Sequence, residues 1–180
     1  MNNTEAHAPA LPAGYRIRAL GPQDALALEW EGEYSHYRRL YALALSRAAA
    51  GQAQLWGAVD AHDALVGQVF VLLYAENDLV SADGHSCAFI HSFRVRPQHR
   101  NGGLGTGLMQ HAEADLRQRG FGFVTLNVAD DNPAAMRLYR RLGYQPLQPI
   151  SGYWSFVDHE GVQRYRHEPG WRMGKQLVSG

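Results

Sequence analysis

A chain of 180 residues with 17 basic and 17 acidic side chains has the size of one domain and no net charge. This balance excludes the strongly basic surface typical of proteins that bind nucleic acid or anionic membranes. One cysteine, Cys87, excludes an internal disulfide framework and suits a reducing compartment, so we expect a cytoplasmic protein. No apolar run approaches the length of a membrane span. We expect residues 1–13 to be a disordered tail and residues 14–178 to form a single domain.

The first half of the domain reads as a strand, a helical segment and two further strands. The sequence pattern predicts strands at residues 15–20, 53–59 and 65–74, with helical material from residue 22 to residue 50. A turn at residues 60–63 predicts that the last two of these strands form a hairpin.

A glycine-rich turn between a strand and a helix follows. The strand-like run 88–95 leads into Val-Arg-Pro-Gln-His-Arg-Asn-Gly-Gly-Leu-Gly-Thr-Gly at residues 95–107. The helix is predicted from apolar residues that recur four positions apart, with Gly120 placed to end it: Leu104, Leu108, Ala112 and Leu116. Such a turn aims successive backbone N–H groups at an anion, and Arg100 adds a fixed positive charge. The turn therefore predicts binding of a phosphorylated cofactor.

Two common phosphate-binding loops are excluded. A P-loop ends in Gly-Lys-Ser/Thr, but no lysine follows Gly105 or Gly107. The dinucleotide motif Gly-x-Gly-x-x-Gly, begun at Gly103, has Leu108 where its third glycine is required. What fits is Arg-x-x-Gly-x-Gly, formed by Arg100, Gly103 and Gly105. Taken alone, this motif has a plain glycine-rich turn as its alternative interpretation.

A second motif lies at residues 126–144, which read Leu-Asn-Val-Ala-Asp-Asp-Asn-Pro-Ala-Ala-Met-Arg-Leu-Tyr-Arg-Arg-Leu-Gly-Tyr. A β-rich run at 123–128 precedes it. Asn132 followed by Pro133 is a strong signal for the start of a helix, and Gly143 is placed to end it. The motif thus predicts a strand followed by a short helix.

The C-terminal part of the chain is predicted to be all strand. Strands are expected at residues 144–147, 153–157, 162–167 and 172–177. The turn Asp158-His159-Glu160-Gly161 predicts a β-hairpin before the final strand.

The two motifs, in this order and with Val95 and Pro97 before the first, resemble the signature of the GNAT N-acetyltransferase superfamily. The match is specific over about residues 86–146. The resemblance implies an α+β fold of three layers (α/β/α) with a central mixed, mostly antiparallel sheet. It also implies that two neighbouring parallel strands, one from each motif, splay apart so that the pantetheine arm of acetyl-CoA lies between them.

The resemblance assigns the cofactor site. The backbone N–H groups of the turn and helix start would hold the pyrophosphate, with the residues Asn101, Gly102, Gly103, Leu104, Gly105 and Thr106. Backbone groups of Phe93, Arg94 and Val95 would pair with the pantetheine like an added strand. The amide of Asn132 would contact the cofactor arm, and its alternative role is that of a helix N-cap.

Tyr139 and His91 are the candidate catalytic residues. Tyr139 lies seven residues after Asn132, so both side chains face the same side of a helix, about 10 Å apart. Its phenol can hydrogen-bond or protonate the leaving thiolate, as the resemblance implies, and the alternative is a core tyrosine. Alternation along the first motif strand places His91 on one face with Phe89, Phe93 and Val95.

His91 stands where many of the relatives that the chain resembles carry a glutamate that accepts the proton of the amine. A histidine titrating near neutrality suits that work, but a buried core histidine is the alternative. Tyr74, Glu76 and Asp78 are fallback candidates for the base, and direct capture of an unprotonated amine needs none.

For the acceptor site we single out Glu31, Tyr34 and Trp154, with a solvated helix face or a cover of the sheet as alternatives. Trp154 shares a strand face with Phe156, and three carboxylates follow in the sequence: Asp158, Glu160 and Glu168. Aromatic faces with carboxylates suit a cationic amine. No His or Cys spacing suits a metal site.

The leading hypothesis is an acetyl-CoA-dependent N-acetyltransferase that acts on a primary amine by direct attack in a ternary complex. A catalytically inactive acyl-CoA-binding regulatory module is the alternative. The balanced charge argues against a transferase directed to nucleic acid. We expect a small-molecule amine, or a peptide or protein amine, as acceptor, no metal, no nucleic-acid or membrane partner, and a monomer or homodimer.

Overall fold

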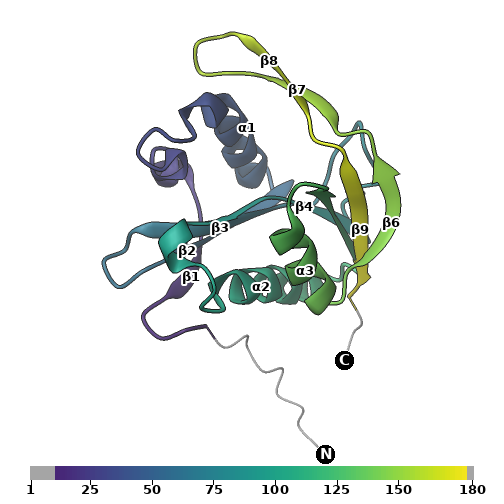
Figure 1. Ribbon diagram of the computed structural model, residues 1–180, viewed down its shortest axis with the longest axis horizontal. Coiled ribbons are helices and arrows are strands. Elements are labelled where there is room, and N and C mark those ends of the chain that lie inside the picture. The colour runs from purple at the N-terminus through teal and green to yellow at the C-terminus, as the bar shows by residue number, and fades with distance from the viewer. Residues whose placement is uncertain (1–10, 178–180) are drawn as a thin grey trace, which may run out of the picture.

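Seven strands form one mixed sheet in the order β1-β2-β3-β4-β5-β9-β6, and only β4 and β5 are parallel. The computed structural model describes residues 11–177 (Figure 1). The strands of this sheet are β1 (Arg16–Ala19), β2 (Ala53–Val59), β3 (Leu65–Leu72), β4 (Cys87–Val95), β5 (Phe123–Ala129), β6 (Gln145–Ile150) and β9 (Gly170–Gln176).

Helices cover both faces of the sheet (Figure 1). On one face lies α1 (Arg38–Ala49), whose Tyr41 and Leu45 pack in a core with Phe70 of β3. On the other face lie α2 (Leu104–Gln118) and α3 (Pro133–Arg141). The apolar stripe predicted for α2 is wholly buried there: Leu104, Leu108, Ala112 and Leu116. The predicted α/β/α layering is therefore confirmed.

The helical segment predicted from residue 22 to residue 50 is helical mainly at its end. Before α1 the chain makes three short 3₁₀ turns, η1 (Pro22–Asp24), η2 (Ala27–Glu29) and η3 (Ser35–Tyr37). The reason lies at residues 30–32, where Trp30, Glu31 and Gly32 all have positive φ angles. Left-handed backbone cannot continue a right-handed helix, so the chain turns before α1 begins.

The parallel pair β4–β5 separates half-way along β4. Register partners run only from Cys87 opposite Phe123 to Ile90 opposite Leu126. Beyond Ile90, the β5-facing edge of β4 has no strand partner in the described part of the chain. This confirms the predicted splay of the two motif strands.

A β-bulge at Ser92 changes the faces of β4. Phe70 of β3 pairs with His91 and Gln68 pairs with Arg94, so two residues of β4, Ser92 and Phe93, lie opposite one residue of β3. Ser92 has a left-handed backbone (φ 51°). An extra residue reverses the alternation of side chains along a strand.

The prediction that Phe89, His91, Phe93 and Val95 share one face is therefore wrong. Val95 is buried in the core under α2, and Phe93 packs against that core. The His91 ring instead lies 5.7 Å from the ring of Phe70, which belongs to the core under α1.

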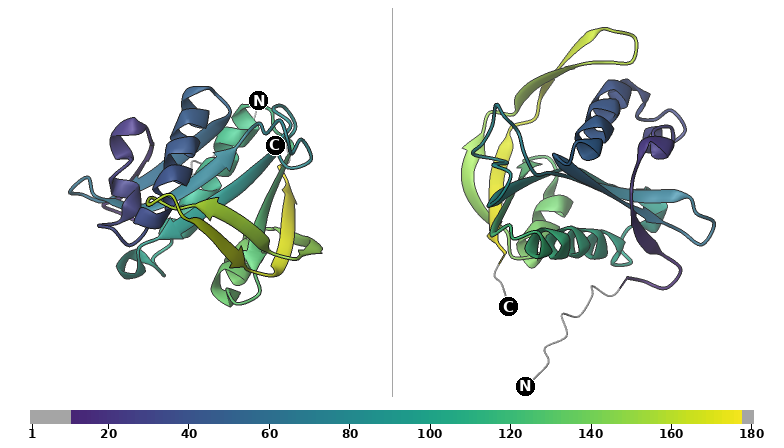
Figure 2. Two further views of the ribbon diagram at one scale, coloured as in Figure 1. Left: turned by 90° about the horizontal axis from the view of Figure 1, so that it is seen from above. Right: turned by 180° about the vertical axis from the view of Figure 1, so that it is seen from behind.

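The predicted C-terminal hairpin is confirmed as β7 (Tyr153–Val157) paired with β8 (Gln163–His167). It forms a sheet of its own and reaches past α1, as all three views show (Figures 1 and 2). The last strand, β9, then lies between β5 and β6, and it begins at Gly170 rather than at the predicted Arg172.

The structure covers only part of the predicted N-terminal tail and nearly all of the predicted domain. Most of the predicted tail, and Val178 at the end of the predicted domain, lie outside the described residues; within them, Leu11 packs against the core under α2. Between residues 11 and 177, no helix has the length and apolarity that crossing a membrane requires.

Candidate functional site

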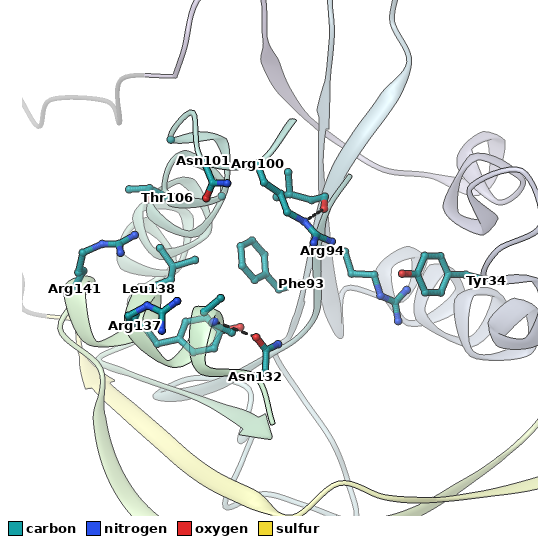
Figure 3. A pocket seen from close by; sticks show the side chains of 16 residues that line it. Tyr34, Phe93, Arg94, Arg100, Asn101, Thr106, Asn132, Arg137, Leu138 and Arg141 are labelled. Atoms are coloured by element: carbon teal, nitrogen blue, oxygen red, sulfur yellow. Dashed lines mark hydrogen bonds between the residues drawn. The ribbon is translucent and has the colours of Figure 1, made fainter. Parts of the chain in front are cut away.

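A cavity of about 680 Å³ opens where β4 leaves β5, between the first turn of α2 and the helix α3 (Figure 3). It brings together most of the predicted cofactor and catalytic residues. Those that line it are Tyr34, Phe93, Arg94, Val95, Arg100, Asn101, Gly103, Gly105, Thr106, Asn132 and Tyr139. Gly102 and Leu104 belong to the same turn without lining the cavity, and Leu104 is buried in the core.

Other predicted residues do not line this cavity. These are the candidate base His91, the acceptor candidates Glu31 and Trp154, and the fallback residues Tyr74, Glu76 and Asp78. The cavity instead includes five α3 residues that the sequence analysis did not single out: Ala134, Ala135, Arg137, Leu138 and Arg141.

The turn before α2 is built to present free N–H groups. Asn101 (φ 62°) and Gly103 (φ 90°) are both left-handed, which curls the backbone around Gly102. No side chain caps the N-terminus of α2, so its first N–H groups lack the partner that a cap supplies. The Arg100 Nε donates to the carbonyl oxygen of Val95 at 2.7 Å, which ties the turn to the end of β4. An uncapped helix start behind such a turn is suited to an anion.

Positive charge surrounds this anion site. Four arginines line the cavity, Arg94, Arg100, Arg137 and Arg141, whereas no Asp or Glu is among the described residues that line it. Arg137 and Arg141 were missed, although their spacing of four residues on a predicted helix already placed them on one face. The cavity therefore favours a ligand with several negative charges.

Asn132 is the N-cap of α3, which is one of the two roles predicted for it, the other being contact with the cofactor arm. Its side-chain oxygen accepts a hydrogen bond from the Ala135 N–H at 3.1 Å. The NH₂ group of the same amide has no acceptor within the described residues, and the side chain lines the cavity. One amide can thus cap the helix through oxygen and offer its N–H groups to a ligand.

Tyr139, on α3, lines the cavity with its phenol ring. Its ring lies 6.2 Å from the Phe93 ring and 5.9 Å from the Tyr144 ring. Burial raises the pKa of the Tyr139 phenol above its usual range, so the hydroxyl stays protonated at neutral pH. The hydroxyl has no hydrogen-bond partner among residues 11–177, and it remains available as a donor to a ligand.

His91 is held on the opposite face from Phe93. Its Nδ1 lies 3.1 Å from the Ser92 hydroxyl, and its ring stacks near Phe89. Burial, reinforced by the positive charge of Arg47, lowers the pKa of His91 to about 4. The expectation of a histidine that titrates near neutrality is therefore wrong: the imidazole is neutral at pH 7 and a weak base.

Three of the acceptor-side carboxylates already have hydrogen-bond partners. Glu31 accepts hydrogen bonds from both terminal nitrogens of Arg96, at 2.7 and 2.9 Å. Trp154 Nε1 donates to Glu168 at 3.0 Å, and Arg164 Nε donates to Asp158 at 2.6 Å. Ion pairs thus neutralise Glu31 and Asp158, whereas the neutral indole N–H leaves the charge of Glu168 in place.

Across the described range, no three His, Cys, Asp or Glu side chains gather where they could hold a metal ion. Cys87 is half-buried, donates to the Ser81 carbonyl oxygen, and has a pKa raised by burial. Those surroundings fit a structural thiol better than a nucleophile.

The lowered pKa of His91 predicts a pH-dependent stability. Between pH 6.5 and 4 the unfolded chain binds a proton at His91 and the folded chain does not, so stability falls as pH falls through this range. At pH 5 the loss amounts to on the order of 1–2 kcal/mol. Chemical denaturation at pH 7 and pH 5 should show a smaller loss for a His91→Gln variant than for the wild type. Equal losses in both proteins would contradict the assigned direction of the shift.

Comparison with known proteins identifies the family. Residues 22–144 match the model of the Acetyltransferase (GNAT) family. The streptothricin acetyltransferase of Streptomyces lavendulae is 33% identical over 99 residues, which are 49% of this chain and 52% of that protein. The mycothiol acetyltransferase of Saccharomonospora viridis is 30% identical over 156 residues, 78% of this chain and 49% of that protein. The chain thus spans about half the length of these curated relatives.

Solved structures share the fold. Arabidopsis thaliana NAA60 in complex with acetyl-CoA superimposes with a TM-score of 0.67 at 19% identity, covering 90% of this chain and 98% of that one. The splayed parallel strands, the glycine-rich turn before α2 and the match over residues 22–144 agree with one another. The chain belongs to the GNAT acetyltransferase family.

Proposed function

We propose that the protein binds acetyl-CoA in this cavity and transfers the acetyl group to a primary amine by direct attack in a ternary complex. The observation that carries the proposal is the cavity itself. It joins an uncapped helix start, four arginines and an unpaired strand edge in one space. Coenzyme A presents the matching parts, since it has phosphates at one end and amide groups along its arm. The acetyl-CoA complex of a protein with the same fold supports this cofactor.

Each part of the cofactor has a proposed partner. The N–H groups at residues 101–106 hold the pyrophosphate, and Arg137 and Arg141 of α3 add positive charge beside it. The pantetheine amides pair with the β5-facing edge of β4 at residues 93–95, as an added strand does. The Asn132 NH₂ group donates to the same arm.

In the reaction, the amine nitrogen attacks the thioester carbonyl carbon, a C–N bond forms and the C–S bond breaks. The sulfur leaves with the electron pair as a thiolate. Tyr139 donates a hydrogen bond to it from a phenol that burial keeps protonated. Because a thiol has an ordinary pKa of about 8.5, below that of this phenol, we expect Tyr139 to stabilise the thiolate by hydrogen bonding. Solvent then supplies the proton that completes the thiol.

The amine must lose a proton when it attacks. His91 remains our sequence-based candidate for the base, although it lies outside the cavity lining and its neutral form is a weak base. The competing route is capture of an amine that is already unprotonated, with its proton passing to solvent.

The activity is tested by release of free thiol from acetyl-CoA in the presence of an amine and peptide panel. The panel includes streptothricin, because one relative is named for its acetylation. Release that depends on the amine supports the transferase. Tight binding of CoA with no release for any amine would support the inactive acyl-CoA-binding module instead.

The phosphate turn is tested at Gly105. A Cβ atom there lies 3.1 Å from the Phe93 ring and 3.6 Å from Val95, so valine pushes into the cavity wall. We expect Gly105→Val to weaken CoA binding by about tenfold or more, which is about 1.4 kcal/mol, as measured by calorimetry. Gly122→Ala, where a Cβ meets no atom within 4 Å, is the control. Unchanged CoA affinity in a folded Gly105→Val protein would remove the turn from the cofactor site.

The role of Tyr139 is tested by Tyr139→Phe, which removes only the hydroxyl. We expect kcat to fall on the order of a hundredfold while the affinity for CoA changes little. Steady-state kinetics and calorimetry on the same preparation separate the two effects. Full turnover in the variant would assign Tyr139 to packing alone.

The base is tested by the pH dependence of kcat/KM in the wild type and in His91→Ala. If His91 is the base, kcat/KM rises with pH as the His91 imidazole loses its proton, with a pKa of about 4. The His91→Ala variant then lacks this rise. If the amine reacts unassisted, both proteins share a limb set by the pKa of the amine, and the limb moves when the amine is changed.

A further inference from the structure

Arg94 turns its side chain away from the proposed cofactor arm, toward the segment before α1. Its guanidinium carbon lies 4.0 Å from the centre of the Tyr34 ring and 5.1 Å from that of Tyr37. Its Nη1 donates a hydrogen bond to the Tyr41 hydroxyl. Figure 3 shows the guanidinium against the face of Tyr34. These contacts fix the position of a cation at one end of the cavity.

No carboxylate pairs with Arg94 within residues 11–177. Three acidic groups of this region have other partners: Glu29 pairs with Arg38, Glu31 with Arg96 and Asp158 with Arg164. A guanidinium has five N–H donors, and the only bond that Arg94 makes to a described residue uses one of them. The remaining donors of a half-buried, oriented guanidinium have no protein acceptor in the described chain.

Positive groups outnumber negative ones around Arg94. The pKa of the nearby His36 is lowered by burial and by the charges of Arg166 and Arg94. Arg166 itself lies over the Phe156 ring, 5.4 Å from its centre. The Glu33 carboxylate lies near the Tyr34 hydroxyl and forms no ion pair with Arg94 among the described residues, and the positive charge of Arg100 also acts on this hydroxyl. With Arg94, Arg100 and Arg166 against one such carboxylate, an anionic group is favoured here over a cationic one.

The phosphates of the cofactor do not account for this cation. Arg137 and Arg141 lie on α3, on the other side of Phe93 from Arg94 and Tyr34 (Figure 3). Arg100 is tied to the turn before α2. Arg137 and Arg141 thus lie at the α3 end of the cavity, whereas the charge of Arg100 also reaches the Tyr34 hydroxyl beside Arg94.

Beyond the residues that line the cavity, further aromatic side chains lie beside Arg94. Tyr37 lies 5.0 Å from Phe156 and stacks on Trp154 at 6.3 Å, so η3 and β7 form a continuous apolar wall beside Arg94. A planar cation beside such a wall matches a planar carboxylate attached to an apolar group.

We propose that Arg94 binds a carboxylate of the acceptor, so that the substrates are amines that also carry a carboxylate group. This inference rests on the proposed transferase function and names its substrate class.

The test compares matched acceptors with purified protein and acetyl-CoA. Each amino acid of a series with one, two or three carbons between amine and carboxylate, with and without an aromatic side chain, is paired with its neutral carboxamide. We expect kcat/KM for the carboxylate form to exceed that for the amide by about tenfold or more. In Arg94→Met this preference should disappear through a higher KM for the carboxylate form.

Two further variants separate pairing from general charge. Arg94→Lys keeps the charge but loses the planar fork, so we expect it to keep only part of the preference. Arg39→Met removes an exposed cation near the start of α1 that does not line the cavity, and it should keep the full preference. Calorimetric affinity for CoA and the melting temperature of each variant show whether it folds. A preference that survives in a folded Arg94→Met, or none in the wild type, overturns the proposal.

Binding of the N-acetylated products to the CoA-loaded protein gives a readout that needs no turnover. The product with a carboxylate should bind more tightly than its amide, and Arg94→Met should remove the difference. Absence of thiol release with this difference present would reject the transferase and keep the carboxylate site. Thiol release without any difference between carboxylate and amide, in binding or in kinetics, would keep the transferase and reject the carboxylate site.

Discussion

A single extra residue in β4, the β-bulge at Ser92, determines which faces of the sheet the side chains around the cavity occupy. Ser92 adopts a left-handed backbone, and the bulge reverses the order of side chains after His91. In the same stretch, pairing with β5 ends at Ile90, so one edge of β4 lies open. The bulge therefore sends Phe93 to the side of α2 and α3 and Arg94 to the side of α1. Two adjacent residues thereby serve the two ends of one cavity.

The charges of the cavity follow the same division. One end combines the uncapped start of α2 with Arg137 and Arg141, and the other has Arg94 among aromatic rings. The charge of Arg100, in the turn before α2, also reaches Tyr34 at the Arg94 end. The phenol ring of Tyr139 also lines the cavity, 6.2 Å from the Phe93 ring. Two nearby carboxylates have partners of their own, since Glu31 pairs with Arg96 and Asp158 with Arg164. The described residues that line the cavity consequently carry four positive charges and no carboxylate, although the chain as a whole has no net charge.

Sequence reasoning predicted the parts of the fold that local chemistry determines. Glycines at 103 and 120, the Asn132-Pro133 start and the apolar stripe of α2 each impose a conformation on their own segment. The bulge at Ser92 gave no such signal, because serine is not a typical left-handed residue and tertiary pairing imposes it there. The prediction that His91 shares a face with Phe93 and Val95 was wrong for that reason. Cytoplasmic location and oligomeric state stay predictions.

The hairpin β7–β8 has a consequence for how such a protein can diversify. It shares no strand pairing with the main sheet, and it rests on η3 through the rings of Phe156, Trp154 and Tyr37. At the base of the hairpin, the Glu168 N–H donates a hydrogen bond to the Gly152 carbonyl oxygen, which joins the two ends of the hairpin. Insertions and substitutions along the β7–β8 hairpin can therefore accumulate without breaking a hydrogen bond of the seven-stranded sheet. Mutation can remodel one wall of the acceptor side while the half of the fold that would hold the cofactor stays unchanged.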